Sequence, residues 1–360
     1  MATQISSLPA STAPRLVHGS LSDPARAILG PRRDALLIWG MPLVAFLLVQ
    51  LWLRGWDSLA PQELSRPMVV GMFVATAVLT WAHLIAVVPR AYLNPEVFAA
   101  YKLRLTVVPV VLITGLLFSH TALVFASVLA VFWDVHHSAM QNFGFSRIYD
   151  MKAGNPPAML RTTDLRLNWM LYVGPLAAGA ALAVHTKYLL QFDGTIFHTL
   201  TSVPGVLASD HEGIRLGAIA LYAVVIGWTL FDYARAMRAG YRLPAHKLAT
   251  IVVTGTVSIL AWGFSPPLVA LAAINLYHAV QYFALVWVKE GGRMTARMSR
   301  NGKARGRTAA FFFLGCLVFG IGYALAGQGR VHWFLAPFVA CSLLHFWFDS
   351  FIWSVRKAHV

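Results

Sequence analysis

The feature that most constrains the fold is an uncharged apolar segment from Leu268 to Val288, which carries His278 near its middle. As a helix, it is about long enough to cross the hydrocarbon core of a bilayer. Pro266 and Pro267 precede it, and a double proline suits a turn followed by the first turn of a helix. An ionisable side chain inside such a segment is costly without a partner. The sequence therefore predicts a membrane-spanning helix whose histidine meets polar groups from elsewhere in the chain.

The composition predicts that this helix is one of many. Of the 360 residues, 58% are hydrophobic and 12% are charged, whereas soluble domains carry roughly 25% charged residues. The pattern indicates an all-α, polytopic integral membrane protein with roughly ten transmembrane helices. The apolar runs cover residues 35–53, 67–88, 103–118, 120–145, 167–187, 213–234, 247–264, 267–289, 308–326 and 331–353.

The basic residues predict how these helices are oriented. The formal net charge of +15 is concentrated in alternate loops, and the densest cluster runs from Lys289 to Arg307. The intervening loops carry acids such as Asp57, Asp193 and Asp210. This alternation is the positive-inside pattern, so we expect both termini in the cytoplasm and no nucleic-acid partner. The predicted organisation is a flexible or surface-lying N-terminal arm, a single helical membrane domain and a short cytoplasmic tail, at residues 1–34, 35–353 and 354–360.

Four histidines lie well inside apolar runs that are expected to cross the membrane in the same direction. They fall at similar distances from the predicted cytoplasmic ends, in the inner half of the membrane. Four helices can therefore bring four imidazoles to one depth, and imidazole is a ligand for iron, copper and zinc. The residues alone do not distinguish these metals. Each histidine taken singly can also serve only as a hydrogen-bond partner between helices. The four candidate ligands are His83, His137, His278 and His345.

Polar residues near the four histidines are candidates for orienting them. A metal-bound imidazole usually donates its second ring nitrogen to a carboxylate, a carbonyl or another polar group. Asp349 follows His345 by four residues and so lies on the same helix face. The other candidates for this supporting role are Asn142, Tyr277, Gln281 and Tyr282.

Four short segments resemble, in order, the Brp/Blh family of membrane β-carotene 15,15′-dioxygenases. The first is Trp81-Ala82-His83, where the family has P-H-G-x-x-D. The second is the run from His137 to Phe143, which is similar to H-F-G-M-A-D-F. The third is Leu260–Trp287, which leads through two prolines to a histidine. The fourth is Leu344-His345 with Asp349 and Phe351-Ile352-Trp353, which is similar to P-H…D-F-I-F.

The resemblance implies an enzyme of the bacterial inner membrane. Its four histidines would hold Fe(2+), and O₂ would cleave a carotenoid-like polyene, with β-carotene giving retinal. The partners would be this lipophilic substrate, O₂ and the lipid bilayer. No catalytic residue is expected beyond the metal centre. The chain departs from the family at four positions. Val87 and Asn142 replace acids, Tyr282 replaces a further histidine, and the late acid, Asp349, is displaced by about one residue.

Two other classes of protein would use the same intramembrane histidines. A haem-binding electron carrier would ligate the haem iron through a pair of them. A transporter would use them to relay protons or to bind its substrate. The absorption spectrum and the metal content of the protein separate these alternatives from a non-haem oxygenase.

Overall fold

A computed structural model describes residues 17–52, 66–188, 211–298, 304–328 and 332–353 of the chain. The described residues are almost entirely helical, and their only strands are the two-residue pair β1 (Val17–His18) and β2 (Leu243–Pro244). The predicted all-α class is confirmed. The helices are α1 (Pro31–Leu37), α2 (Met41–Trp52), α3 (Arg66–Ile85), α4 (Val88–Ala91), α5 (Pro95–Phe118), α6 (His120–Lys152), α7 (Arg161–Ala178), α8 (Leu182–Tyr188), α10 (His211–Arg238), α11 (Ala245–Phe264), α12 (Pro267–Met298), α13 (Arg305–Gln328) and α14 (His332–Ile352).

The described residues contain fewer candidate spans than the roughly ten expected for the chain. Among the described residues, seven helices are long and apolar enough to cross a membrane, or eight if the bent helix α6 counts as one span. The predicted span 167–187 is broken at Gly179, where α7 ends before α8 begins. A side chain at Gly179 would meet the Cα atom of Gly263 at 2.4 Å, and the Ala181 amide donates to the Gly263 carbonyl. This close approach to the end of α11 interrupts the helix. The count of ten is not confirmed.

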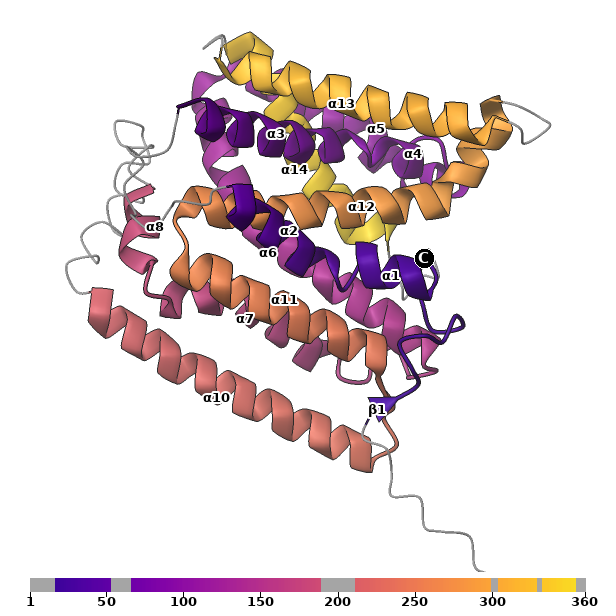
Figure 1. Ribbon diagram of the computed structural model, residues 1–360. Coiled ribbons are helices and arrows are strands. Elements are labelled where there is room, and N and C mark those ends of the chain that lie inside the picture. The colour runs from indigo at the N-terminus through magenta and orange to yellow at the C-terminus, as the bar shows by residue number, and fades with distance from the viewer. Residues whose placement is uncertain (1–16, 53–65, 189–210, 299–303, 329–331, 354–360) are drawn as a thin grey trace, which may run out of the picture.

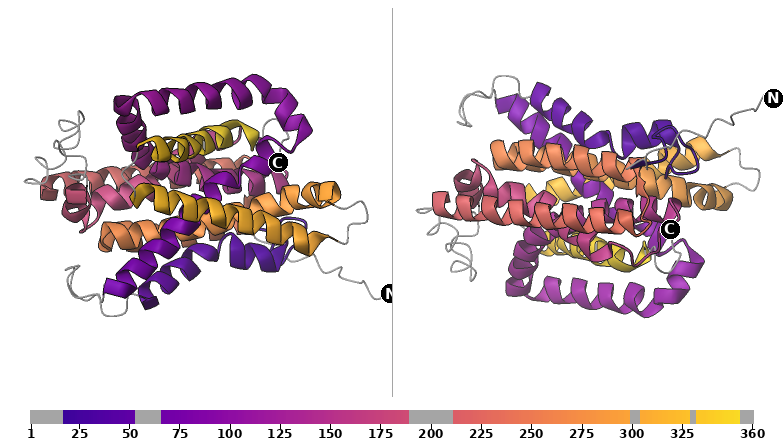
Figure 2. Two further views of the ribbon diagram at one scale, coloured as in Figure 1. Left: turned by 90° about the horizontal axis from the view of Figure 1, so that it is seen from above. Right: turned by 90° about the horizontal axis from the view of Figure 1, so that it is seen from below.

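Helix α12, which carries His278, is the centre of the molecule. Figure 1 shows it between a group formed by α7, α10 and α11 and a group formed by α3, α5 and α13. It packs against α2 and α3, while α14 packs against α5 and α6. The views from above and below in Figure 2 show the long helices running roughly side by side. Within the apolar stretch of α12, 72% of the residues are buried, whereas the corresponding share for α10 is 6%. A segment surrounded in this way can hold a polar site away from lipid.

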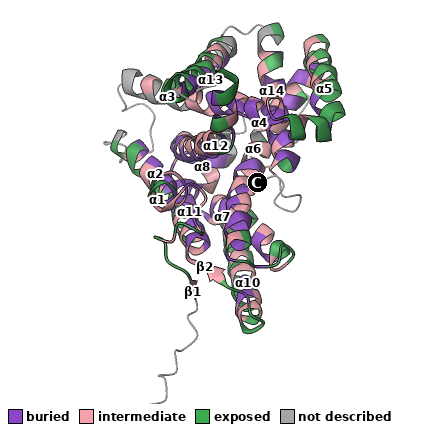
Figure 3. Cartoon of the chain, turned by 90° about the vertical axis from the view of Figure 1, so that its right-hand side faces the viewer, coloured by how far each residue is buried: buried purple, intermediate pink, exposed green. Residues whose placement is uncertain are grey.

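The outer helices expose large apolar side chains. In Figure 3, many residues of α5, α10 and α13 are coloured as exposed. Leu103 on α5 is 74% exposed, and Phe231 on α10 and Phe311 on α13 are each more than 60% exposed. A soluble protein rarely leaves continuous apolar faces open to water. Together with the apolar helices, this surface indicates a multi-pass membrane protein.

Helices α5 and α6 are joined by a single residue, Ser119. It ends α5, and its hydroxyl accepts a hydrogen bond from the Ala122 amide at the start of α6. At the other end of α5, the Asn94 side chain accepts from the amides of Glu96 and Val97, and Pro95 occupies the first turn. These are favourable helix-start residues because they satisfy amides that have no partner within the helix.

Two groups of contacts join segments that the charge pattern assigns to one side of the membrane. In the first, β1 pairs with β2, and Asn155 hydrogen-bonds to the backbone of Arg242. In the second, Arg90 pairs with Glu290 and stacks on Trp353. Segments assigned to the same side by the alternation of loop charges therefore contact each other. That this side faces the cytoplasm stays a prediction.

Part of the expected N-terminal arm is packed on the helical domain. Asp34 is fully buried and accepts hydrogen bonds from the amides of Ile28 and Leu29 and from the hydroxyl of Tyr149 on α6. Residues 1–16 of the arm and the tail 354–360 lie outside the described residues.

Candidate metal centre

The four predicted histidines come from four different helices that meet around α12. His83 lies in the last turn of α3, His137 lies within α6, and His345 lies in the second half of α14. His278, in the middle of α12, completes the set. All four side chains are buried, and none is more than 3% exposed. The predicted convergence is present in the structure.

One nitrogen from each of the four imidazoles lies within 4.8 Å of the corresponding nitrogen of every other. The rings follow each other in a closed circle, with centroids 4.8–4.9 Å apart in the order His83, His278, His137, His345. Two nitrogens on opposite sides of an ion, each bound at about 2.1 Å, are about 4.2 Å apart. The circle is therefore close to the size that a single ion requires.

A backbone contact fixes the ring of His345. Its Nδ1 atom is 3.1 Å from the carbonyl oxygen of Leu84, which can only accept, so Nδ1 carries the proton. The Nε2 atom of the neutral ring then has a free lone pair, and it lies 3.2 Å from Nε2 of His137. This is the arrangement in which a carbonyl holds the outer nitrogen and the inner nitrogen is left to bind a metal.

Other ring nitrogens in the circle lack partners. Both ring nitrogens of His83 and Nε2 of His278 are buried and make no hydrogen bond of normal geometry with any described residue. Leaving a buried polar atom unsatisfied costs about 1–3 kcal/mol. A metal ion at the centre of the circle would accept one lone pair from each of these two rings, so the residues present fit such an ion.

A small polar group borders the circle on one side. The Oδ2 atom of Asp349 is 3.6 Å from Nε2 of His345 and 3.9 Å from Nε2 of His137. Its Oδ1 atom accepts from the Tyr282 hydroxyl at 2.8 Å and from Nε1 of Trp353 at 3.2 Å. The Tyr282 ring also packs edge-on against His345, with centroids 4.7 Å apart. Trp353 was not among the residues expected to support the site.

The other three residues expected to orient the histidines bond elsewhere among the described contacts. The Tyr277 hydroxyl pairs with that of Tyr172 at 2.8 Å. The Gln281 amide donates to the Ile38 carbonyl and accepts from the Gln141 side chain. Asn142 contacts Asn168 and Thr254. These side chains hold α12 and α6 against neighbouring helices. They therefore act on the site by setting the positions of the helices that carry His278 and His137.

Close packing of α13 sets the position of α3. A side chain at Gly320 on α13 would meet the carbonyl oxygen of Val78 at 2.2 Å and the amide nitrogen of Ala82 at 2.9 Å. The lack of a side chain at Gly320 allows the two backbones to touch immediately before His83. The sequence shows this glycine but not the helix that it faces.

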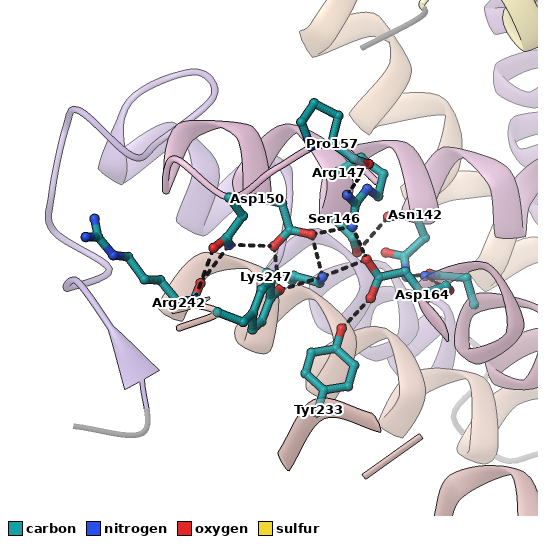
Figure 4. Close-up of polar contacts among 12 residues, drawn as sticks. Asn142, Ser146, Arg147, Asp150, Pro157, Asp164, Tyr233, Arg242 and Lys247 are labelled. Carbon is teal, nitrogen blue, oxygen red and sulfur yellow. Dashed lines mark hydrogen bonds and ion pairs between the residues drawn. The ribbon is translucent and has the colours of Figure 1, made fainter. Parts of the chain in front are cut away.

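A buried cluster of charges joins α6, α7 and α11 (Figure 4). Arg147 and Lys247 each form ion pairs with both Asp150 and Asp164, and all four side chains are at least 93% buried. Both basic residues belong to the set of charges that the alternation assigns to the cytoplasmic loops. Their positions instead place them in helices α6 and α11, where two acids neutralise them. Asp150 lies near the end of α6 and Asp164 lies in the first turn of α7. These two acids were the signal in the sequence that the basic residues have buried partners.

Tyr241 completes this cluster from the loop before α11. Its hydroxyl donates to Asp150 at 2.5 Å and accepts from the Lys247 ammonium at 2.9 Å. Burial, and then the negative charge of Asp150, raise the pKa of the Tyr241 hydroxyl far above its usual value. The hydroxyl therefore stays protonated and serves as a donor, which satisfies the acid and makes the cluster a structural tie between helices.

Comparison of the chain with family models, with curated proteins and with solved structures gives no match.

Proposed function

We propose that the four histidines bind one divalent transition-metal ion and that the protein is a membrane oxygenase acting on a lipophilic molecule. The specific proposal is a bacterial inner-membrane dioxygenase that uses Fe(2+) to cleave a carotenoid-like polyene, with β-carotene giving retinal. The observation that carries the proposal is the closed circle of four buried imidazoles, with nitrogens within 4.8 Å of each other.

The geometry favours a single ion over a haem. A haem supplies four nitrogens of its own and leaves two positions for the protein. In this site, four imidazole nitrogens from four helices surround one point, and a porphyrin has no room among them. Unpartnered nitrogens on His83 and His278 give the ion a structural reason to bind.

Iron and the polyene substrate are supported by the resemblance to the Brp/Blh family. The four residues in the circle are the four histidines of the segments that resemble that family's motifs. Imidazole nitrogens alone also suit copper and zinc, so the choice of iron depends on the resemblance. The bilayer location supports an apolar substrate, because such a molecule reaches the protein from the lipid.

The protein's own contribution is to hold and enclose the site. The four helices place the imidazoles, the Leu84 carbonyl orients His345, and Phe346 packs beside His137 with ring centroids 4.6 Å apart. These aromatic and apolar neighbours exclude water from the centre, which protects a reactive site from side reactions. A bound iron would supply the redox chemistry by which O₂ is activated.

The first experiment expresses the chain in a bacterial host that accumulates β-carotene and measures retinal in extracts. His137 and His136 are adjacent, but only His137 belongs to the circle, while the half-buried ring of His136 packs on Trp169. We expect retinal from the wild type and from His136→Ala, and none from His137→Ala. Retinal that persisted in His137→Ala would contradict the proposed site.

The metal is measured independently on purified protein. We expect about one iron per chain, no intense Soret absorption, and loss of iron in His137→Ala. A Soret band would indicate the haem alternative. Protein that carries no metal but moves a solute in a histidine-dependent manner would indicate the transport alternative. Bound iron without retinal formation would retain the metal centre and direct the search to another lipophilic substrate.

A further inference from the structure

The carboxylate of Asp349 occupies a position that a ligand to the proposed ion would take. Its Oδ2 atom lies 3.6 Å from Nε2 of His345 and 3.9 Å from Nε2 of His137, and these two nitrogens are 3.2 Å apart. Ligands bound at about 2.1 Å are about 3.0 Å apart at a right angle and about 3.4 Å apart at the tetrahedral angle. The three atoms therefore form a triangle whose edges are within about half an ångström of such spacings.

The rest of the carboxyl group is held so that this oxygen faces the histidines. Tyr282 and Trp353 both donate to Oδ1, at 2.8 Å and 3.2 Å. Oδ2 accepts no hydrogen bond among the described contacts, and the polar atoms recorded beside it are the facing ring nitrogens of His345 and His137. A carboxylate that orients an imidazole would contact the nitrogen pointing away from the metal. In His345, that nitrogen bonds to the Leu84 carbonyl instead.

The charge of Asp349 also suits this role. Four neutral imidazoles leave both positive charges of a divalent ion uncompensated, and an uncompensated charge is costly in a buried site. No lysine or arginine in the described part of the chain forms an ion pair with Asp349. The nearby Arg90 pairs with Glu290 at 2.6 Å. As a ligand, the Asp349 carboxylate would therefore offset one positive charge of the ion without competition from a described lysine or arginine.

We propose that Asp349 binds the metal directly through Oδ2, so that the centre has four imidazoles and one carboxylate. This inference rests on the proposed metal site and extends it. Tyr282 and Trp353 are positioning residues that hold the carboxylate through its other oxygen. An oxygen ligand shifts the preference of the site away from copper(I), which favours soft ligands, and toward divalent ions such as iron(II) or manganese(II).

The test measures metal affinity and coordination on the purified full chain. Cobalt(II) is the probe, because its visible absorption weakens as the coordination number rises from four to five or six. The variants are Asp349→Asn, Asp349→Ala and Tyr282→Phe. Glu96→Gln, an exposed acid at the start of α5, is the matched control. Circular dichroism and size exclusion identify variants that fail to fold.

We expect weak cobalt absorption in the wild type and in Glu96→Gln. Asp349→Ala should give stronger, four-coordinate absorption and lower the affinity by more than the roughly 10- to 100-fold that loss of a supporting partner costs. Asp349→Asn should lower the affinity in the same direction. Tyr282→Phe keeps the carboxylate, so its affinity should fall within that 10- to 100-fold range with the absorption still weak.

The outcomes separate this inference from the proposed function. Wild-type protein that binds no metal contradicts both. Wild-type protein that binds cobalt with four-coordinate absorption, unchanged in Asp349→Ala, overturns the carboxylate ligand and leaves the four-histidine centre in place. If both Asp349 variants fail to fold, Tyr282→Phe decides, because unchanged metal affinity in that variant contradicts a carboxylate held for metal binding.

Discussion

The Nδ1 atom of His345 donates a hydrogen bond to the carbonyl of Leu84, 261 residues earlier in the chain. Leu84 directly follows His83, so this bond joins the helices that carry two of the four candidate ligands. It also fixes the proton of His345 on the outer nitrogen and directs the other nitrogen to the centre. Helix packing and ligand geometry are therefore coupled at this point.

The first prediction concerns His345 as a ligand. Replacing it with glutamine removes one of four imidazoles, so we expect the bound metal to fall to background in elemental analysis of purified protein. The matched control is His185→Gln, because His185 is also buried and contacts a carbonyl, that of Trp262, at 3.1 Å. It lies outside the circle, and its variant should retain the metal. Equal metal loss in both variants would count against a role specific to His345.

The second prediction concerns removal of the metal. An ion that binds only the folded chain stabilises it, by about 4 kcal/mol when the free ion is at 1,000 times its Kd. We expect chelated protein in detergent to melt at a lower temperature than metal-loaded protein. The difference should shrink as the pH falls, because protons compete with the ion for the ring nitrogens. A difference that grows toward acid pH would contradict imidazole ligation.

The third prediction concerns the buried charge cluster. Lys247→Met leaves Asp150 and Asp164 with one cation fewer, and breaking a buried ion pair in this way costs about 3–5 kcal/mol. Arg238→Met, at an exposed cation at the end of α10, should cost less than about 1 kcal/mol. Thermal unfolding in detergent measures both. Metal affinity should change little in Lys247→Met, and a large loss of metal with unchanged stability would assign the cluster to the metal site.

The fourth prediction concerns the contact between α13 and α3. Gly320→Ala places a methyl group against the α3 backbone, so we expect a loss of about 1–3 kcal/mol in stability from overpacking. The metal affinity should also fall, since the displaced residue Ala82 precedes His83. Gly315→Ala on the same helix meets nothing within 4 Å and should be neutral or slightly stabilising. Chemical denaturation and metal titration of the two variants provide the comparison.

Much of the helical arrangement could be predicted, because an apolar run in lipid has to form a helix. The convergence of His83, His137, His278 and His345 could also be predicted, since alternate loop charges place them on helices of one direction. The break at Gly179 could not, because it depends on the approach of Gly263 from a helix that lies far away in the sequence. A hydropathy pattern describes one segment at a time and contains no such contact.

The supporting residues illustrate the same limit. Helical spacing places Gln281 on the face of His278 and Asp349 on the face of His345. Only Asp349 reaches the circle, because the Gln281 amide contacts Ile38 and Gln141. Spacing along a helix gives the face of a side chain, while the packing of neighbouring helices decides what that face meets. Trp353 was missed although it follows Asp349 by four residues, so the same helical spacing could have identified it.

The long separation between His83 and His345 has a consequence for biosynthesis. Helix α14 is made after the other three ligand helices, so the fourth imidazole and the Leu84 contact are absent while those helices enter the bilayer. The earlier helices must then pack around an incomplete set of imidazoles, and the proposed ion would be captured as a late event in assembly. Maturation of the protein would therefore depend on metal supplied to a nearly finished bundle and not to the growing chain.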